Sequence, residues 1–395
     1  MIYLLYFLVV TMLAIFVTQR KQALISVITL TFFYIALSYP AGGDWLGYFI
    51  NYDCLINDRC YDDFIVFEPG YQLVVLITGQ LGFQGILISL ALLNAILLYK
   101  YARHFENGAL VYIFIMCMFI WALHFEAIRQ ALAVSITMYG IKSLAEKKIK
   151  RYIIIILLAA AFHITALICL LFIIPVYFPR LSKLSGYMMV GLGGLLVLIL
   201  GSVLTVILSI LPAGSLAYEK LNFYLSTEQY QPQLSIGIGT VLDIVLLFVI
   251  AISFSKIKKQ HLVYNKNFLN ITFLGVCIYV FFSIIIGKMM PVMTRIGWYG
   301  FPFVIIAIYS NIGESIYIKK CRRNAGVSFT ALCIYGYFIL QIFRPFTYDY
   351  SNYNLMHQET IFQNINQMDD QSLRNAAKDK CSVLTKLGYG FLCSI

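Results

Sequence analysis

The chain is dominated by runs of 17 or more apolar residues, separated by short polar connections along most of its length. A run of that length lets an α-helix cross about 30 Å of hydrocarbon. Hydrophobic residues make up 61% of the sequence and charged residues only 12%, whereas a soluble domain carries about 25% charged residues. The sequence therefore predicts an integral membrane protein. A helical bundle is favoured over a membrane β-barrel, because a barrel would show alternating segments of about ten residues.

The predicted fold class is all-α, a polytopic transmembrane helix bundle with about 11 spans. This bundle would occupy residues 1–343, with outer loops at 40–83 and 212–235, and residues 344–395 would form a periplasmic tail. The expected apolar segments are approximately 2–18, 23–39, 84–101, 109–124, 128–144, 152–178, 187–211, 236–255, 268–287, 297–316 and 327–343. The sequence holds no Walker loop, so no ATPase of its own is expected to power the protein.

The segment 152–178 does not fit a simple count of spans. Its 27 residues are too few for two full transmembrane helices of about 20 residues each. The alternation of basic loops along the chain nevertheless requires an even number of crossings here. We expect a re-entrant or short hairpin with its bend near Phe162 and His163. The alternative is that the glycine-interrupted segment 187–211 is the irregular one.

The basic residues follow the positive-inside rule. Arg20 and Lys21 occupy the first connection, and later basic clusters lie near 100–103, 147–151, 256–266 and 319–323. These connections are predicted to be cytoplasmic, which places the N-terminus, both outer loops and the tail on the outer side of the membrane. Most acidic residues then lie outside. The net charge of +11 is therefore interpreted as a topology signal with membrane lipids as its partner, not as a nucleic-acid footprint.

Two cysteine pairs lie in the predicted outer segments. Cys54 and Cys60 share the first outer loop, and Cys381 and Cys393 share the tail. Both pairs are compatible with disulfides in an oxidising periplasm, and free thiols are the alternative. No Cys/His spacing resembles a zinc site.

Two candidate carboxylates stand in the first outer loop. Asp44 follows Gly42-Gly43 after the second span, with Tyr48 one helical turn further on. Glu68 precedes Pro69 and Tyr71, where a proline in the first turn and an acidic residue at the positive end of the dipole both suit a helix start. Structural roles as a turn residue and a dipole partner are the alternatives to function.

The densest polar cluster is His124-Phe125-Glu126-Ala127-Ile128-Arg129-Gln130, at the predicted outer junction of two spans. Arg129 and Gln130 open an apolar helix that has no acidic residue before Glu146. Arg129 would therefore either pair with Glu126 or await an anionic ligand. The planar guanidinium fork in a low dielectric suits a diphosphate.

Three further polar residues lie in or beside apolar segments. His163 stands at the proposed bend, and Arg295 stands at the outer end of a later span with Tyr299 one turn on. A packed core histidine and an arginine snorkelling in an aromatic belt are the alternatives. Asp243, inside a span, is interpreted as an interhelical hydrogen-bonding residue.

In this order the motifs resemble the EpsG family of Wzy-type polysaccharide polymerases. They are Gly-Gly-Asp-x-x-x-Tyr (42–48), Glu-Pro-Gly-Tyr (68–71), Ile-Arg-Gln-Ala-Leu-Ala (128–133), Phe-His-x-Thr-Ala-Leu (162–167) and Arg-x-x-x-Tyr (295–299). The likeness covers most of residues 1–300. It implies a polymerase that joins undecaprenyl-diphosphate-linked oligosaccharide repeats at the periplasmic face, and a fold similar to GT-C glycosyltransferases. A chain-length regulator protein is a further partner that it implies.

The resemblance and the residues together predict a mechanism. Arg129, with Arg295 beside it, would stabilise the charge that grows on the departing diphosphate. Asp44, Glu68 or His163 would orient or deprotonate the acceptor hydroxyl. Substrate-binding roles are expected for the remaining polar and aromatic residues, which are His124, Glu126, Gln130, Tyr48, Tyr71, Arg295 and Tyr299. The sequence lacks an Asp-x-Asp metal motif, so neither a metal nor another cofactor is expected.

Three other functions share many of these features. An O-antigen ligase would use almost the same residues. A flippase for the lipid-linked sugar would need a charged central cavity, whereas the charges here gather at one face. A membrane-bound O-acyltransferase would also use a membrane histidine, but it should offer its acyl donor a cytoplasmic entry.

Overall fold

The computed structural model describes residues 2–60, 67–226, 237–256, 266–317, 325–347 and 359–386, together with Cys393. All regular elements in these ranges are helices, as the sequence predicts. The chain forms two compact units. One contains residues 1–141, 153–167 and 338–395, and the other contains residues 142–152 and 168–337. This division differs from the predicted one, which separated a bundle (residues 1–343) from a tail (residues 344–395).

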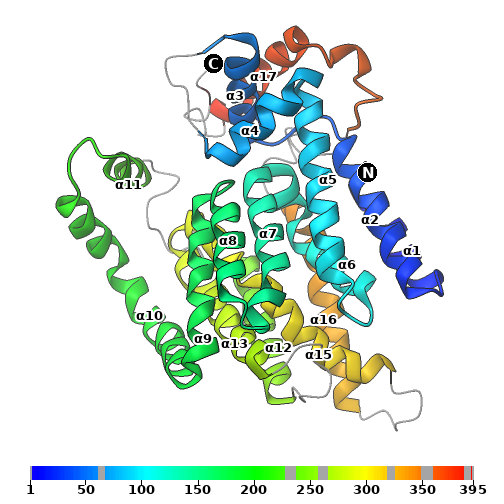
Figure 1. The fold of residues 1–395 in the computed structure, drawn as a ribbon, viewed down its shortest axis with the longest axis vertical. Helices are drawn as coiled ribbons and strands as arrows, with labels where there is room; N and C mark the ends of the chain where they lie inside the picture. Colours follow the sequence, from blue (N-terminus) through cyan, green and yellow to red (C-terminus); the bar gives the residue numbers. More distant parts are fainter. Residues whose placement is uncertain are drawn as a thin grey trace. The chain divides into compact units, whose positions relative to one another are not determined.

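The first unit, here called unit 1, is built from the N-terminal helices and the tail. Helix α2 packs against α1, α5 and α6, and the short helices α3 and α4 lie side by side after it (Figure 1). The helices of unit 1 are α1 (Ile2–Phe16), α2 (Arg20–Ala36), α3 (Trp45–Asn57), α4 (Pro69–Thr78), α5 (Phe83–Ala102), α6 (Gly108–Phe119), the π-helical turn η2 (Ile120–Glu126), most of α7 (Ile128–Ala145) and α8 (Ile149–Ala160), and α17 (Asp370–Lys386).

The second unit, unit 2, has α13 at its centre, packed against α9, α10 and α15. Its helices are α9 (Ile174–Tyr177), α10 (Pro179–Ile210), α11 (Leu216–Ser226), α12 (Ile238–Lys256), α13 (Lys266–Tyr279) with its π-helical continuation η5 (Val280–Ile285) and the short η6 (Ile286–Lys288), α14 (Pro291–Gly297), α15 (Phe301–Tyr317) and most of α16 (Ala325–Phe343). Asp243 of α12 pairs with Lys288 at 2.6 Å. The ion pair links α12 to η6, so Asp243 makes the kind of contact between helices that the sequence predicts. The sequence alone does not identify Lys288 as its partner.

Many helices follow the predicted apolar segments, but the count of about 11 spans is not confirmed. Within the described residues, three helices are long and apolar enough to cross a membrane: Phe83–Ala102, Gly108–Glu126 and Leu269–Lys288. A fourth is added if the bent pair Pro179–Val197 and Ile199–Ile210 counts as one span. Others, such as α1 with its 15 residues, are apolar but shorter. Apolar side chains are exposed on α1, α5, α8 and α10, which suits contact with lipid.

The segment expected to be irregular, 152–178, and the alternative to it, 187–211, are both interrupted. Helix α8 ends at Ala160, and the chain resumes after His163 as the 3₁₀ helix η3 (Ile164–Ile173). The break therefore lies at Phe162 and His163, where the bend was predicted. Helix α10 is itself bent by 89° after Val197, inside the glycine-interrupted segment.

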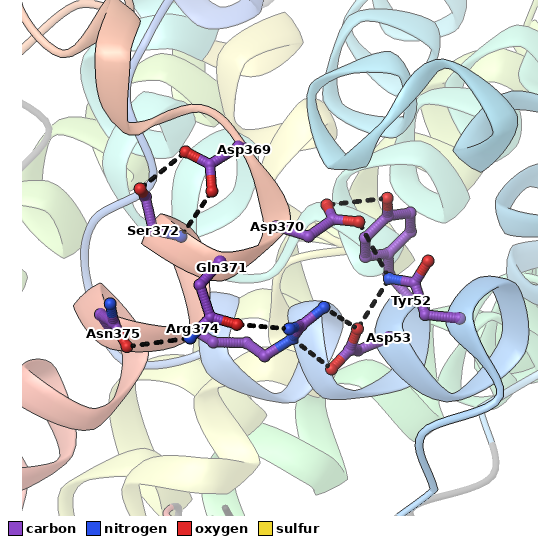
Figure 2. A network of polar contacts seen from close by, with 9 residues as sticks. Tyr52, Asp53, Asp369, Asp370, Gln371, Ser372, Arg374 and Asn375 are labelled. Carbon is purple, nitrogen blue, oxygen red and sulfur yellow. Dashed lines mark hydrogen bonds and ion pairs between the residues drawn. The ribbon is translucent and has the colours of Figure 1, made fainter.

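Within unit 1, the tail is anchored to α3 through polar contacts, which Figure 2 shows. Arg374 of α17 donates to both carboxylate oxygens of Asp53, from Nε at 3.0 Å and from Nη2 at 3.3 Å. The hydroxyl of Tyr52 and the amide of Asn57 each donate to Asp370 at 3.0 Å. Asp53 is only 1% exposed, so Arg374 supplies the positive charge that a buried carboxylate requires.

A backbone bridge adds a second anchor. Tyr39 N donates to Glu359 O at 3.1 Å, and Ile361 N donates to Leu37 O at 2.9 Å. Both predicted disulfides are present, Cys54–Cys60 beside α3 and Cys381–Cys393 at the end of α17.

Candidate active site

The junction between η2 and α7 separates two charged side chains. Ala127 has φ −97° and ψ 58°, outside the helical region, so the chain changes direction between Glu126 and Arg129. Glu126 is 8% exposed, and Gln130, in the first turn of α7, is fully buried. The two charges therefore meet different neighbours.

Glu126 binds the glycine turn that precedes α3. The main-chain N–H groups of Gly43 and Asp44 each donate to Glu126 Oε2 at 3.2 Å. Gly42 has φ +83°, and a Cβ at that position would lie 1.9 Å from Glu126 Oε1. Only glycine fits a position with both properties. The alternative pairing of Glu126 with Arg129 is wrong, because Glu126 Oε2 accepts from these amides and Arg129 pairs with Glu68.

Arg129 pairs instead with Glu68, the residue before Pro69 at the start of α4. The side chains are 17% and 20% exposed. The Arg129 guanidinium carbon lies 3.8 Å from the ring centre of Phe67, 5.6 Å from that of Tyr48 and 5.9 Å from that of Tyr71. An ion pair surrounded by aromatic rings is weakly screened by water, so its charges act strongly on a neighbouring anion.

The pair also lies where two helices begin. Glu68 precedes α4, and Arg129 is the second residue of α7. Helix N-termini carry partial positive charge and unpaired N–H groups, which favour anions. Arg129 adds a full positive charge to the partial charges of the two helix N-termini, and the negative charge of Glu68 offsets part of this total. Arg129 Nε and the Tyr71 hydroxyl are both buried without a hydrogen-bond partner among the described residues. An oxygen-rich ligand would satisfy both donors.

The turn that carries His163 lies against the start of α4. Gly70 N donates to Ala161 O at 2.7 Å, and Ile164 N lies 3.4 Å from Glu68 Oε1. A Cβ on Gly70 would approach Ala161 O to 2.7 Å, so a glycine is needed for this contact. His163 Nδ1 lies 2.6 Å from the Thr165 hydroxyl. The structure thus brings the His163 turn, Glu68 and Arg129 together from three separate parts of the sequence.

A small cavity of about 30 Å³ lies beside this cluster. His124, Tyr48 and Trp45 line it, together with Tyr39 and Asn94. The Nε1 of Trp45 is buried without a hydrogen-bond partner among the described residues. Asn94 of α5, which accepts from Ser135 Oγ at 2.6 Å, is absent from the predicted site. An amide within an apolar helix was the available signal.

Arg295 and Tyr299 belong to unit 2, whereas the residues of this cluster belong to unit 1. Arg295 lies half-buried in α14, which Pro291 opens, and Tyr299 is 1% exposed just after that helix. Ser283 of η5 donates to Thr294 O at 3.1 Å and fixes the neighbouring backbone. A role for Arg295 beside Arg129 remains a prediction.

The site has the side chains for acid–base and anion chemistry. In the part of the chain that the structure describes, no three His, Cys, Asp or Glu residues gather where they could hold a metal ion. A sequence model of the EpsG family matches residues 21–355. The chain belongs to the EpsG family. Members of the EpsG family are related to exopolysaccharide polymerases, so this chain is a helical membrane protein of polysaccharide biosynthesis. No curated protein and no solved structure matches the chain.

The motifs that carried the resemblance lie inside the EpsG match. Four of the five are in unit 1: the Gly42 turn, the start of α4, the start of α7 and the His163 turn. The tail beyond residue 355 lies outside the match.

Proposed function

We propose that this EpsG-family chain polymerises undecaprenyl-diphosphate-linked oligosaccharide repeats at the periplasmic face of the bacterial inner membrane. The observation that carries the proposal is the Arg129–Glu68 pair, enclosed by Phe67, Tyr48 and Tyr71 at the start of two helices. An enclosed guanidinium at helix N-termini, beside apolar helices, suits a diphosphate attached to a lipid.

In the proposed reaction, an acceptor hydroxyl oxygen attacks the anomeric carbon of the donor. The bond from that carbon to the diphosphate oxygen breaks, and undecaprenyl diphosphate leaves with the electron pair. Arg129 stabilises the negative charge that develops on the leaving oxygen. The reaction is a glycosyl transfer of the GT-C type and requires no metal ion in this scheme.

The acceptor proton passes to a base, for which the residues are not equivalent. The Glu68 carboxylate is already engaged in the ion pair with Arg129, so Glu68 suits the positioning of Arg129 better than general-base catalysis. His163 suits the base in the tautomer that carries its proton on Nδ1, because Nδ1–H would then donate to the Thr165 hydroxyl and leave the lone pair on Nε2. Asp44 is engaged through its main-chain N–H by Glu126 and is the second candidate for the base.

The test is an Arg129→Ala variant in a host that lacks the wild-type gene. We expect elongation to fall about 100-fold to 1,000-fold, because loss of one charge-stabilising donor has that effect in other enzymes. A gel of surface polysaccharide should show single repeats but no ladder of longer chains. Arg129→Lys should also be defective, since an ammonium does not reproduce the two-pronged contact of guanidinium.

Arg20→Ala is the matched control. Arg20 also pairs with a glutamate, Glu106, but the side chains are 46% and 59% exposed. Exposed pairs contribute little, so the ladder should remain. A flippase defect would remove even the single repeats, and a ligase defect would leave long chains unattached. A normal ladder from Arg129→Ala at normal abundance would refute the proposed site.

A further inference from the structure

A second, larger cavity lies between the tail and the turn that follows α2. Its volume is about 290 Å³, at the lower end of the range for small-molecule sites. The α2 side contributes Tyr39, Pro40 and Ala41. The tail contributes Glu359, Asn364, Gln367, Ala376, Asp379, Lys380 and Val383. All of these residues belong to unit 1.

The lining has the chemistry of a carbohydrate site. Two amides, two carboxylates, an ammonium and a phenol surround a cavity whose remaining wall is apolar. Each sugar hydroxyl both donates and accepts hydrogen bonds, so it needs donors and acceptors together. The Tyr39 hydroxyl is buried without a hydrogen-bond partner among the described residues, and Tyr39 is 8% exposed. A ligand hydroxyl would satisfy it.

The wall of this cavity is held in place independently of any ligand. The Tyr39–Glu359 backbone contact joins its two sides, and Asn364 donates to Glu359 Oε2 at 3.0 Å. The Arg374–Asp53 pair anchors the helix that carries Ala376 and Lys380. Such a site is largely formed before binding, which lowers the entropy cost of association.

The cavity also adjoins the candidate active site. Ala41 precedes Gly42 and Gly43, whose turn Glu126 binds. Burial lowers the pKa of Lys380, while the nearby carboxylates of Glu359 and Glu126 oppose that change. Lys380 is thus close enough to Glu126 for an electrostatic interaction across the turn. Tyr39 lines both this cavity and the small cavity beside His124.

We propose that the cavity is a saccharide subsite that holds a sugar residue of the lipid-linked repeat. The proposal rests on the proposed polymerase function and assigns part of its substrate recognition to the tail. The EpsG match ends at residue 355, before every tail residue that lines the cavity. A wall outside the family's matched region suits recognition of the sugar that is particular to this chain.

The test compares two probes on the full-length protein in nanodiscs. One is undecaprenyl diphosphate carrying the host's repeat, extracted from a strain that lacks this protein, and the other is bare undecaprenyl diphosphate. Wild type should bind the sugar-bearing lipid about tenfold more tightly, and Ala376→Leu should abolish that preference by filling the cavity. Gln367→Ala, a change at an exposed position that leaves the fold intact, should reduce the preference severalfold.

Matched controls lie on the same elements. Asn366→Ala changes the exposed amide next to Gln367, and Ser382→Leu enlarges an exposed residue of α17, and neither residue lines the cavity. Both should keep the wild-type preference. Equal binding of the two lipids by wild type, or an unchanged preference in both Ala376→Leu and Gln367→Ala, would overturn the subsite.

Failure of the subsite and failure of the polymerase proposal give different results. If wild type elongates chains while both cavity variants keep its KM, the subsite is wrong and the polymerase proposal stands. If wild type makes no chains from the sugar-bearing lipid, the polymerase proposal fails. Arg129→Ala should weaken both lipids equally, because it acts on the diphosphate that they share.

Discussion

At the scale of residues, the site depends on which partner each charged side chain binds. Glu126 and Arg129 are three positions apart, yet one binds main-chain amides and the other binds Glu68. The glycine turn determines the partner of Glu126, because it offers two N–H donors to the carboxylate. A larger residue at position 42 would collide with Glu126 and prevent this approach. The absence of a side chain at Gly42 is therefore what allows Glu126 to bind this turn.

Gly42→Ala should disrupt the site more than its backbone strain explains. The new Cβ would collide with Glu126 Oε1 and displace the carboxylate from the amides. Gly82→Ala is the control, since Gly82 has the same φ of +83° with open space around it. Gly82→Ala should cost about 1–2 kcal/mol of stability, measured as thermal unfolding, and should keep its ladder.

A second change separates the collision from the strain. Adding Glu126→Ala to Gly42→Ala removes the atom that is struck, so the double variant should unfold at a higher temperature than Gly42→Ala alone. Equal losses from Gly42→Ala and Gly82→Ala would show that the contact with Glu126 contributes nothing.

At the scale of elements, the tail helix α17 is held by charge and by packing. Leu373, Ala377 and Leu384 form its buried stripe, at the spacing of one helix face. Arg374 lies beside that stripe and reaches Asp53. Because Asp53 is buried, loss of Arg374 would leave an uncompensated charge, which is more costly than loss of an exposed ion pair.

Arg374→Ala should release α17 from α3 and destabilise this contact by about 3–5 kcal/mol. Hydrogen exchange of the α17 amides should become faster, while exchange in α5 and α6 stays as in wild type. Lys378→Ala, an exposed change on the same helix, is the control. Adding Asp53→Asn to Arg374→Ala should restore part of the protection, because it removes the buried charge. Unchanged exchange in Arg374→Ala would mean that packing alone holds the helix.

At the scale of the whole molecule, contacts within unit 1 restrict its topology. The α3 loop and the tail touch, so they lie on one side of the membrane. Arg20 pairs with Glu106, so the connections after α1 and α5 also share a side. Both results agree with the pattern predicted from the basic loops. The assignment of these sides to periplasm and cytoplasm remains a prediction from the positive-inside rule.

Cysteine labelling of spheroplasts tests that assignment. In a background with Cys333→Ser, Asn366→Cys should react with a membrane-impermeant maleimide, because Asn366 is exposed in the tail. Gln22→Cys, exposed at the start of α2, should react only after the membrane is permeabilised. The reverse pattern would invert the orientation.

The sequence predicted those features that depend on residues close together along the chain. Hydropathy located many of the helices, Pro69 marked the start of α4, and the cysteine pairs predicted both disulfides. The cluster in unit 1 was also found, since charged groups at the ends of apolar segments are rare. The partner of Arg129 was missed, because Glu68 lies 61 positions away and Glu126 lies only three.

Helix α17 was missed for a different reason. Its composition is polar, and a search for apolar runs passes over it. The available signal was Asp369, whose carboxylate accepts from Ser372 N at 2.9 Å as a helix cap, followed by the spacing of Leu373, Ala377 and Leu384. The division into two units came from contacts between distant segments, for which the sequence offers no local signal.

The bond between Asp53 and Arg374 has a consequence for how the protein is made. The two residues are 321 positions apart, so at about 5–20 residues per second the ribosome completes Arg374 roughly 15 to 65 seconds after Asp53. During that interval the helices between them can enter the membrane, but the partner of the Asp53 carboxylate does not yet exist. The cavity wall is therefore assembled last. A nascent chain halted before residue 374 would carry the Arg129 cluster without the helix that forms one wall of the neighbouring cavity, so only chains that extend past Arg374 enclose that cavity.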